Sequence, residues 1–336
     1  MLDSILVWFR RDLRDIDHVA LGEALRRGRR VYCAFLFDRD ILDPLVERAD
    51  RRVDFIRESL LELDAALRGR GGGLLLRHGR AAEEIPRLAS ELGVAAVFAN
   101  RDYEPQAKRR DAAVSAALNA GGMAFESFKD QALLDGDEVL TQAGRPFTVF
   151  TPYKKAWLKR LSEDDLQSSE GGPGTLAAPP GAQHPPALAA LGFAATDLRA
   201  LGFVPGMSGA RQLLADFRGR ISRYQQQRDF PALKGVSYLS VHLRFGTISI
   251  RELVAAAIAA GALRPGNEGP ATWLSELVWR DFYFMILDRF PEVAERAFKP
   301  AYDAIAWEQG PQAEQAFAAW CDGRTGYPLV DAAMRQ

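Results

Sequence analysis

The sequence is short of the features that mark several common protein classes. It has only two cysteines, Cys33 and Cys321, and their separation excludes a disulfide framework and a cysteine-based zinc site. No uninterrupted apolar run reaches the ~20 residues that a membrane-spanning helix needs, and the N-terminus, which starts at Met1, lacks the pattern of a secretory signal. We therefore expect a cytoplasmic protein with no membrane partner.

Familiar catalytic and nucleotide-binding signatures are also lacking. No G-x-G-x-x-G follows the first predicted strand and no P-loop occurs, so a dinucleotide fingerprint is not supported. The nucleophile elbow G-x-S-x-G and the zinc motif H-E-x-x-H are missing. The four histidines have neither metal-ligand spacing nor a nearby cysteine, which predicts no metal site; they are His18, His78, His184 and His242.

Charge of either sign is not in excess overall, because 43 basic residues face 44 acidic ones. Any affinity for nucleic acid must then come from a local patch. Between Ala210 and Arg251, eight basic residues face two acidic ones, which gives a local charge of 8 − 2 = +6. The eight are Arg211, Arg218, Arg220, Arg223, Arg228, Lys234, Arg244 and Arg251. Two interpretations of this basic cluster remain open: a solvated helix face and a patch that binds nucleic acid.

The first part of the chain alternates between strand and helix patterns. Amphipathic stretches at 50–67, 81–92 and 106–119 separate short β-branched and aromatic runs. This alternation predicts an α/β domain with a doubly wound, Rossmann-like parallel sheet. The expected strands are 5–9, 31–37, 74–77, 95–99 and 123–128.

The second part is predicted to be all-α, after a stretch at 168–205 rich in Gly, Pro, Ala and Ser that indicates a long surface linker. Helical patterns follow at 210–223, 249–260, 271–289 and 313–321. We expect an α/β domain over 1–130, an interdomain linker over 131–205 and a helical domain over 206–336.

Two segments carry candidate chemistry. In Gly235-Val-Ser-Tyr-Leu-Ser240, Ser240 is predicted to cap a helix, and the free N–H groups there could bind phosphate, or the cap could hold only its own helix. Further on, Trp273, Glu276, Arg280 and Tyr283 share one helical stripe, bordered by Trp279. Either Glu276 and Arg280 form a surface ion pair beside packed tryptophans, or the stripe stacks a planar ligand or an extruded base.

Several motifs in order resemble those of the photolyase and cryptochrome family. The opening Val7-Trp-Phe-Arg-Arg-Asp-Leu-Arg14 is similar to its first strand and turn, and Phe150-Thr-Pro-Tyr153 to its interdomain segment. The segments from Tyr224 to Gly246, from Trp273 to Tyr283 and from Thr325 to Gln336 resemble its flavin-domain motifs. The set is most similar to class I cyclobutane pyrimidine dimer photolyases.

The resemblance implies a carbon–carbon lyase that repairs ultraviolet-damaged DNA in blue light. An excited, reduced FAD would pass an electron to a flipped-out pyrimidine dimer, with Glu276 bonding to the dimer and Trp279 stacking on it. Flavin-binding positions carried over are Tyr224, Val236, Ser237, Tyr238, Leu239, Ser240, Trp273, Arg280 and Tyr283. DNA contacts carried over are Arg228, Glu276, Trp279, Arg280 and Tyr283, and Trp307 matches the outermost tryptophan of an electron-transfer chain.

Departures from the family pattern concern the pigment, the flavin phosphates and the end of the chain. Gln106 and Ala107 replace an Asn-Glu pair of folate-binding members, so methenyltetrahydrofolate, a deazaflavin or no antenna pigment remain open. Val236 replaces a phosphate-binding threonine. Because Gln336 falls within a helix of the flavin domain, we expect a truncated domain and an incomplete flavin pocket. A monomer is expected, and a cryptochrome-type photoreceptor or a non-catalytic remnant are the alternative functions.

Overall fold

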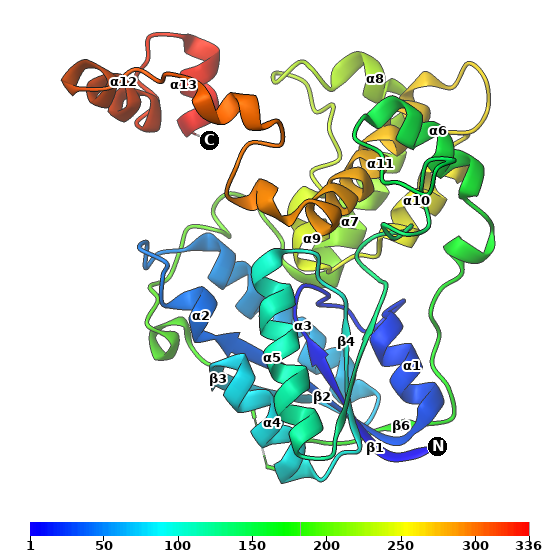
Figure 1. Ribbon diagram of the computed structural model, residues 1–336. Coiled ribbons are helices and arrows are strands. Elements are labelled where there is room, and N and C mark those ends of the chain that lie inside the picture. Colours follow the sequence, from blue (N-terminus) through cyan, green and yellow to red (C-terminus); the bar gives the residue numbers. More distant parts are fainter. Residues whose placement is uncertain (182, 336) are drawn as a thin grey trace. The chain divides into compact units, whose positions relative to one another are not determined.

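A computed structural model describes residues 1–181 and 183–335, and the chain divides into two compact units, Met1–Pro291 and Glu292–Gln336. The first unit contains a parallel sheet whose main strands are ordered β3-β2-β1-β4-β5 (Figure 1). The strands are β1 (Leu2–Phe9), β2 (Gly28–Asp38), β3 (Leu74–Gly79), β4 (Ala96–Asn100) and β5 (Ala124–Phe128). The predicted α/β fold is therefore confirmed.

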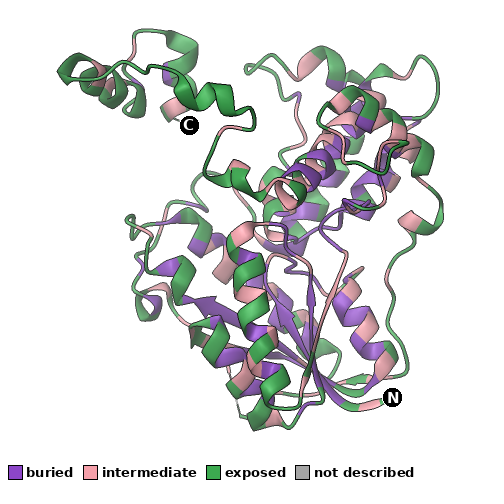
Figure 2. Cartoon of the chain, viewed as in Figure 1, coloured by how far each residue is buried: buried purple, intermediate pink, exposed green. Residues whose placement is uncertain are grey.

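Both faces of this sheet are covered by helices, as the apolar strand sequences require. Alternate side chains of β1 and β2 point to opposite faces, and each face forms its own core cluster. One cluster packs against α1 (Val19–Arg27) and α3 (Arg51–Gly69), and the other against α4 (Ala81–Leu92) and α5 (Pro105–Ala120). Figure 2 shows the strands as the most completely buried part of the chain. Helices α1 and the short α2 (Arg39–Leu42) were not among the predicted elements.

The segment 131–205 is more structured than a surface linker. It contains α6 (Phe150–Arg160), with Tyr153 and Trp157 fully buried, and the short helical turns η1 (Asp164–Leu166) and η2 (Leu188–Leu191). A two-residue strand, β6 (Thr175–Leu176), pairs with β2. Leu191 and Phe193 join the core beside α1 and α3. The interpretation of 168–205 as a surface linker was wrong for Leu191 and Phe193, because composition does not show where isolated apolar residues become buried. The predicted boundaries at 130 and 205 stay predictions; both lie inside the first compact unit.

The helical part of the first unit follows the predicted pattern. It consists of α7 (Gly206–Arg218), η3 (Ile221–Arg223), α8 (Tyr224–Gln227), α9 (Ser240–Phe245), α10 (Ile250–Ala259) and α11 (Glu268–Arg289). Leu274, Leu277, Val278 and Met285 form the buried side of α11. No helix of the described residues is long and apolar enough to cross a membrane.

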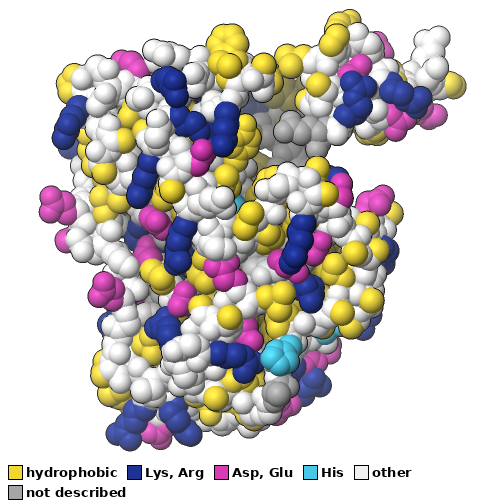
Figure 3. All heavy atoms as spheres, turned by 180° about the vertical axis from the view of Figure 1, so that it is seen from behind, with side chains coloured by type: hydrophobic (Ala, Val, Ile, Leu, Met, Phe, Trp, Pro, Cys, Tyr) yellow, Lys and Arg dark blue, Asp and Glu magenta, His cyan; other side chains and the backbone are white. Residues whose placement is uncertain are grey.

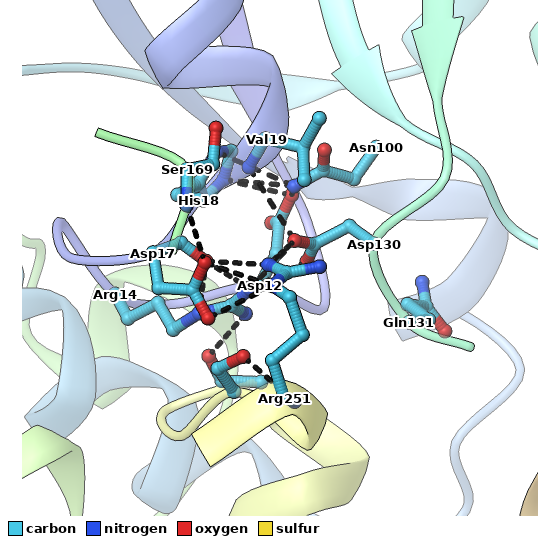
Figure 4. Close-up of polar contacts among 12 residues, drawn as sticks. Asp12, Arg14, Asp17, His18, Val19, Asn100, Asp130, Gln131, Ser169 and Arg251 are labelled. Atoms are coloured by element: carbon cyan, nitrogen blue, oxygen red, sulfur yellow. Dashed lines mark hydrogen bonds and ion pairs between the residues drawn. The ribbon is translucent and has the colours of Figure 1, made fainter. Parts of the chain in front are cut away.

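A buried polar network joins the helices to the sheet (Figure 4). Asp130, which follows β5, accepts hydrogen bonds of 2.7 Å from Arg14 and from Arg251 of α10. Arg251 also donates to Asp17 at 2.8 Å, and all four side chains are at most 10 % exposed. His18 is buried and caps α1 by accepting a hydrogen bond from the Leu21 N–H at 3.0 Å. The network places the helices over the carboxyl ends of the strands.

The second unit contains η5 (Pro300–Ala304), α12 (Pro311–Cys321) and α13 (Pro328–Arg335), after η4 (Pro291–Ala294) at the boundary. Asp331 organises the turn before α13: it accepts hydrogen bonds from the N–H and hydroxyl of Thr325 and from the N–H of Gly326. Trp307 is 75 % exposed within this unit. Its predicted place in an electron-transfer chain stays a prediction.

Candidate functional site

A cavity of about 420 Å³ in the first unit gathers six of the residues that the motifs single out. This volume is within the usual range of ligand pockets, roughly 300–1,000 Å³. The helices α8, α9 and α11, the loop before α9 and the loop after β1 supply its walls, although these segments are far apart in sequence. The predicted residues that line it are Tyr224, Ser237, Ser240, Trp273, Glu276 and Arg280.

Helix α11 supplies one wall of the cavity. Trp273 is 3 % exposed and packs against Phe217 with ring centroids 4.8 Å apart. Arg280, two turns further, donates to the carbonyl oxygens of Gln131 and Leu243 and lies 4.5 Å from the centroid of the Phe284 ring. Burial lowers the pKa of Arg280 to about 10, so its charge is retained at neutral pH. The polar and aromatic stripe predicted on this helix thus faces a cavity at Trp273, Glu276 and Arg280.

The loop before α9 supplies a second wall. Gly235 lies so close to the Gln227 carbonyl that a Cβ would collide with it, which explains glycine at this position. Arg220 fixes the same loop by donating to the carbonyls of Lys234 and Val236 at 2.8 and 2.7 Å. The prediction that Ser240 caps the helix was wrong: Leu239 is the N-cap residue, and its side chain makes no capping bond. The Ser237 and Ser240 side chains line the cavity instead.

Glu276 pairs with Arg228, which follows α8, and not with Arg280. Of the two alternatives for this stripe, the Glu276–Arg280 ion pair is therefore not formed, because Arg280 is turned toward backbone carbonyls. The hydrogen bond to Glu276 raises the pKa of Arg228, which also lies 5.8 Å from the Tyr224 ring centroid. Burial raises the pKa of Tyr224, and the nearby Glu276 charge adds to this shift.

Seven predicted site residues are not among those that line this cavity. Arg228 pairs with Glu276, and Trp307 belongs to the second unit. The other five are Val236, Tyr238, Leu239, Trp279 and Tyr283. Trp279 stacks on Phe150 of α6, with ring centroids 3.5 Å apart and planes 8° apart, and Tyr283 is 62 % exposed. Tyr238 has a left-handed φ of 58° and is 39 % exposed. The structure does not bring these five to the cavity, and their roles stay predictions.

Sequence reasoning missed other lining residues: Arg11, Leu243, Arg244, Leu277 and Phe284. Arg11 follows β1 and reaches the cavity from the α/β part, where it donates to Glu104 at 2.7 Å. Burial lowers the pKa of Arg11. Arg11, Leu243 and Arg244 lie within motifs that carried the family resemblance, which was the available signal. Phe284 had no such signal.

The donor set of the cavity fits a ligand with both phosphate and flat rings, as FAD has. Three guanidinium groups, from Arg11, Arg244 and Arg280, line it together with the hydroxyls of Ser237 and Ser240. Arginine and hydroxyl donors are the side chains that bind phosphate oxygens in proteins. The rings of Tyr224, Trp273 and Phe284 add aromatic surface.

The basic patch predicted between Ala210 and Arg251 is largely neutralised by ion pairs. Five of its eight members pair with carboxylates: Arg220, Arg228, Lys234, Arg244 and Arg251. Arg220 and Arg251 are also buried, whereas Arg211, Arg218 and Arg223 are exposed. On the face shown in Figure 3, Lys and Arg side chains lie interspersed with acidic and apolar ones. The local charge of +6 therefore overestimates what a polyanion would meet.

Comparison with known families gives two matches. Residues 5–171 match the DNA photolyase model, and residues 273–336 match the FAD binding domain of DNA photolyase. A deoxyribodipyrimidine photo-lyase of Synechococcus sp. is 36 % identical over 356 residues, which cover all of this chain and 70 % of the relative.

Solved structures agree with these matches. A class III photolyase from Agrobacterium tumefaciens superimposes with a TM-score of 0.85 at 31 % identity, covering 100 % of this chain and 69 % of the other. A Synechocystis cryptochrome gives a TM-score of 0.82 at 22 % identity, covering 99 % and 70 %, and shows the shared fold. Since the curated relative exceeds 30 % identity over most of its length, the chain belongs to the DNA photolyase family, with an α/β part and a helical FAD-binding part.

Proposed function

We propose that this protein repairs cyclobutane pyrimidine dimers in DNA with light, using FAD. The observation that carries the proposal is the cavity itself. Six residues chosen from motif order alone, between Tyr224 and Arg280, line one cavity together with Arg11 and Arg244. Named photo-lyase relatives support the same reaction class.

The side chains divide into those that would hold the cofactor and those that would meet the lesion. When bound, FAD supplies light absorption and the electron that opens the dimer. Arg280, Arg11 and the two serines would hold its phosphates, while Trp273 gives a buried ring against which a flat group packs. Glu276 would accept a hydrogen bond from the dimer once its carboxylate is free.

Trp279 would stack on the dimer from outside the cavity. Phe150 already covers it, so the pair offers a broad aromatic surface for an apolar, extruded lesion. Helix α6 holds Phe150 there, because Trp157 of the same helix donates to the buried Asp281 of α11 at 3.0 Å. The predicted stacking role of Trp279 stays part of the proposal.

An antenna pigment is a further part of the proposal, and its identity stays open between methenyltetrahydrofolate and a deazaflavin. A small cavity of about 80 Å³ lies at the carboxyl ends of β1 and β2, between Trp8, Phe35 and Phe37. Arg10 and Arg110 lie 4.8 and 5.0 Å from the Trp8 ring centroid. Aromatic walls with cationic neighbours suit part of a flat, anionic ring system, but this volume is below the roughly 300–1,000 Å³ of ordinary ligand pockets, so the cavity does not hold a whole pigment in this structure.

The test combines a spectrum with a repair assay. The purified chain should show a flavin absorption band, and an additional near-ultraviolet or violet band would identify an antenna pigment. Under blue light with a reductant, a duplex with one thymine dimer should lose the dimer, whereas the same mixture in the dark should not. Arg280→Met should reduce flavin content. A flavin-loaded chain that repairs no dimer would refute the repair function.

A blue-light receptor is the second candidate. The observation that favours it is that Trp279, the residue proposed to stack on the dimer, is not among those that line the cavity. A receptor would keep the flavin band and bind damaged and undamaged duplexes equally.

A further inference from the structure

The Arg228–Glu276 ion pair lies at the edge of the cavity and joins the two elements on either side of it. Glu276 of α11 lines the cavity, while Arg228 follows α8 and is not among the lining residues. Both side chains are partly exposed, 31 % for Arg228 and 37 % for Glu276. Arg228 also lies 3.4 Å from Asp229 through its Nε. Solvent can therefore reach both members of this pair.

In this pair the charged group of each residue is bound by the charged group of the other. A guanidinium bound to a carboxylate has fewer donors left for a phosphate, and a carboxylate bound to a guanidinium is a weaker acceptor for a neutral ligand. The roles proposed for Arg228 at DNA and for Glu276 at the dimer are therefore not both available while the pair is closed. Partly exposed ion pairs contribute little to stability, so this one can be exchanged easily.

We propose that a DNA phosphate takes Arg228 from Glu276 and thereby frees the Glu276 carboxylate for the ligand in the cavity. The exchange replaces one oxyanion on Arg228 with another. A phosphate can accept two parallel hydrogen bonds from a guanidinium, as a carboxylate can. Arg228 is then a positioning residue for Glu276 as well as a DNA contact. The inference rests on the proposed function, because it takes duplex DNA as the occupant.

A double-mutant cycle on an undamaged duplex, in the dark and at low salt, tests this exchange without repair chemistry. Glu276→Gln removes the competitor of the phosphate, so affinity should rise by about 1.4- to 5-fold, the range for losing one exposed pair. Arg228→Gln should lower affinity and reduce the slope of log K against log salt by about 0.9. In the double variant, Glu276→Gln should add nothing to Arg228→Gln. The control is Arg223→Gln, an exposed arginine on the same segment, in whose background the Glu276→Gln gain should persist.

The outcomes separate this inference from the proposed function. A gain from Glu276→Gln that is equally large in the Arg228→Gln background would be a general charge effect and would overturn the exchange, whatever the repair assay shows. No gain in either background would overturn it too. A chain that binds no DNA at low salt would refute the exchange and the repair function together. If the wild type repairs the dimer and the effects of Glu276→Gln and Arg228→Gln on affinity simply add, the exchange is refuted and the repair function is not.

Discussion

Replacing Asp130 by Asn should destabilise the first unit by about 3 kcal/mol. The reason is that Arg14 and Arg251, each no more than 8 % exposed, both pair with this carboxylate. Breaking a buried pair by removing one partner costs about 3–5 kcal/mol, since a charge is left uncompensated. We expect the lower end, because Arg251 keeps Asp17 and Arg14 keeps the carbonyls of Asp17 and Gly246.

Urea unfolding followed by tryptophan fluorescence measures this loss. A background with Trp307→Phe and Trp320→Phe, both exposed in the second unit, confines the signal to the first unit. Asp43→Asn is the control, because the Arg39–Asp43 pair is more than half exposed and should cost less than about 1 kcal/mol. A loss for Asp130→Asn no larger than that of the control would refute the reasoning.

The pH dependence of the same variant has a definite sign. Burial alone would raise the pKa of Asp130, but Arg14 and Arg251 outweigh burial and hold that pKa well below its usual range. The unfolded chain then binds the proton more readily than the folded one, so this stability is present above the unfolded pKa of about 3.9 and is lost as the pH falls toward the folded pKa. The gap between wild type and Asp130→Asn should therefore narrow below about pH 4.

Three other perturbations test separate parts of the structure. Phe150→Ala removes the ring stacked on Trp279 and should weaken binding of a dimer-containing duplex by about 0.5–1.5 kcal/mol relative to an undamaged duplex. Phe150→Tyr keeps an aromatic ring and should cause no such loss. Equal losses of affinity for both duplexes would exclude this pair from lesion recognition. Burial lowers the pKa of His242 to about 4, so the folded state resists its protonation and should lose about 2 kcal/mol of stability between pH 7 and pH 4.5. His242→Phe, measured by urea unfolding at both pH values, should lack that loss. Arg223→Gln should reduce the salt slope of DNA binding by up to about 0.9, whereas Arg251→Gln should leave the slope unchanged and destabilise the fold, because Arg251 is buried among carboxylates.

The sequence by itself determined the features that depend on local periodicity. Alternating strand and helix patterns predicted the five main strands of the sheet, and the spacing of Trp273, Glu276 and Arg280 placed them on one side of α11. These follow from the chain geometry of strands and helices, which acts over a few residues. The order of motifs likewise pointed to six of the residues that line the cavity between Tyr224 and Arg280, but not to Leu243, Arg244 or Leu277.

Only the tertiary structure decided which partner each charged group takes. Glu276 has Arg280 one turn away on the same helix, yet it pairs with Arg228, 48 residues earlier in the chain. Arg11, which follows β1, lines the cavity, and Arg251, predicted as part of the basic patch, instead pairs with Asp17 and Asp130. Such choices depend on which distant segments pack together and on which groups lose water there, and no local spacing encodes that.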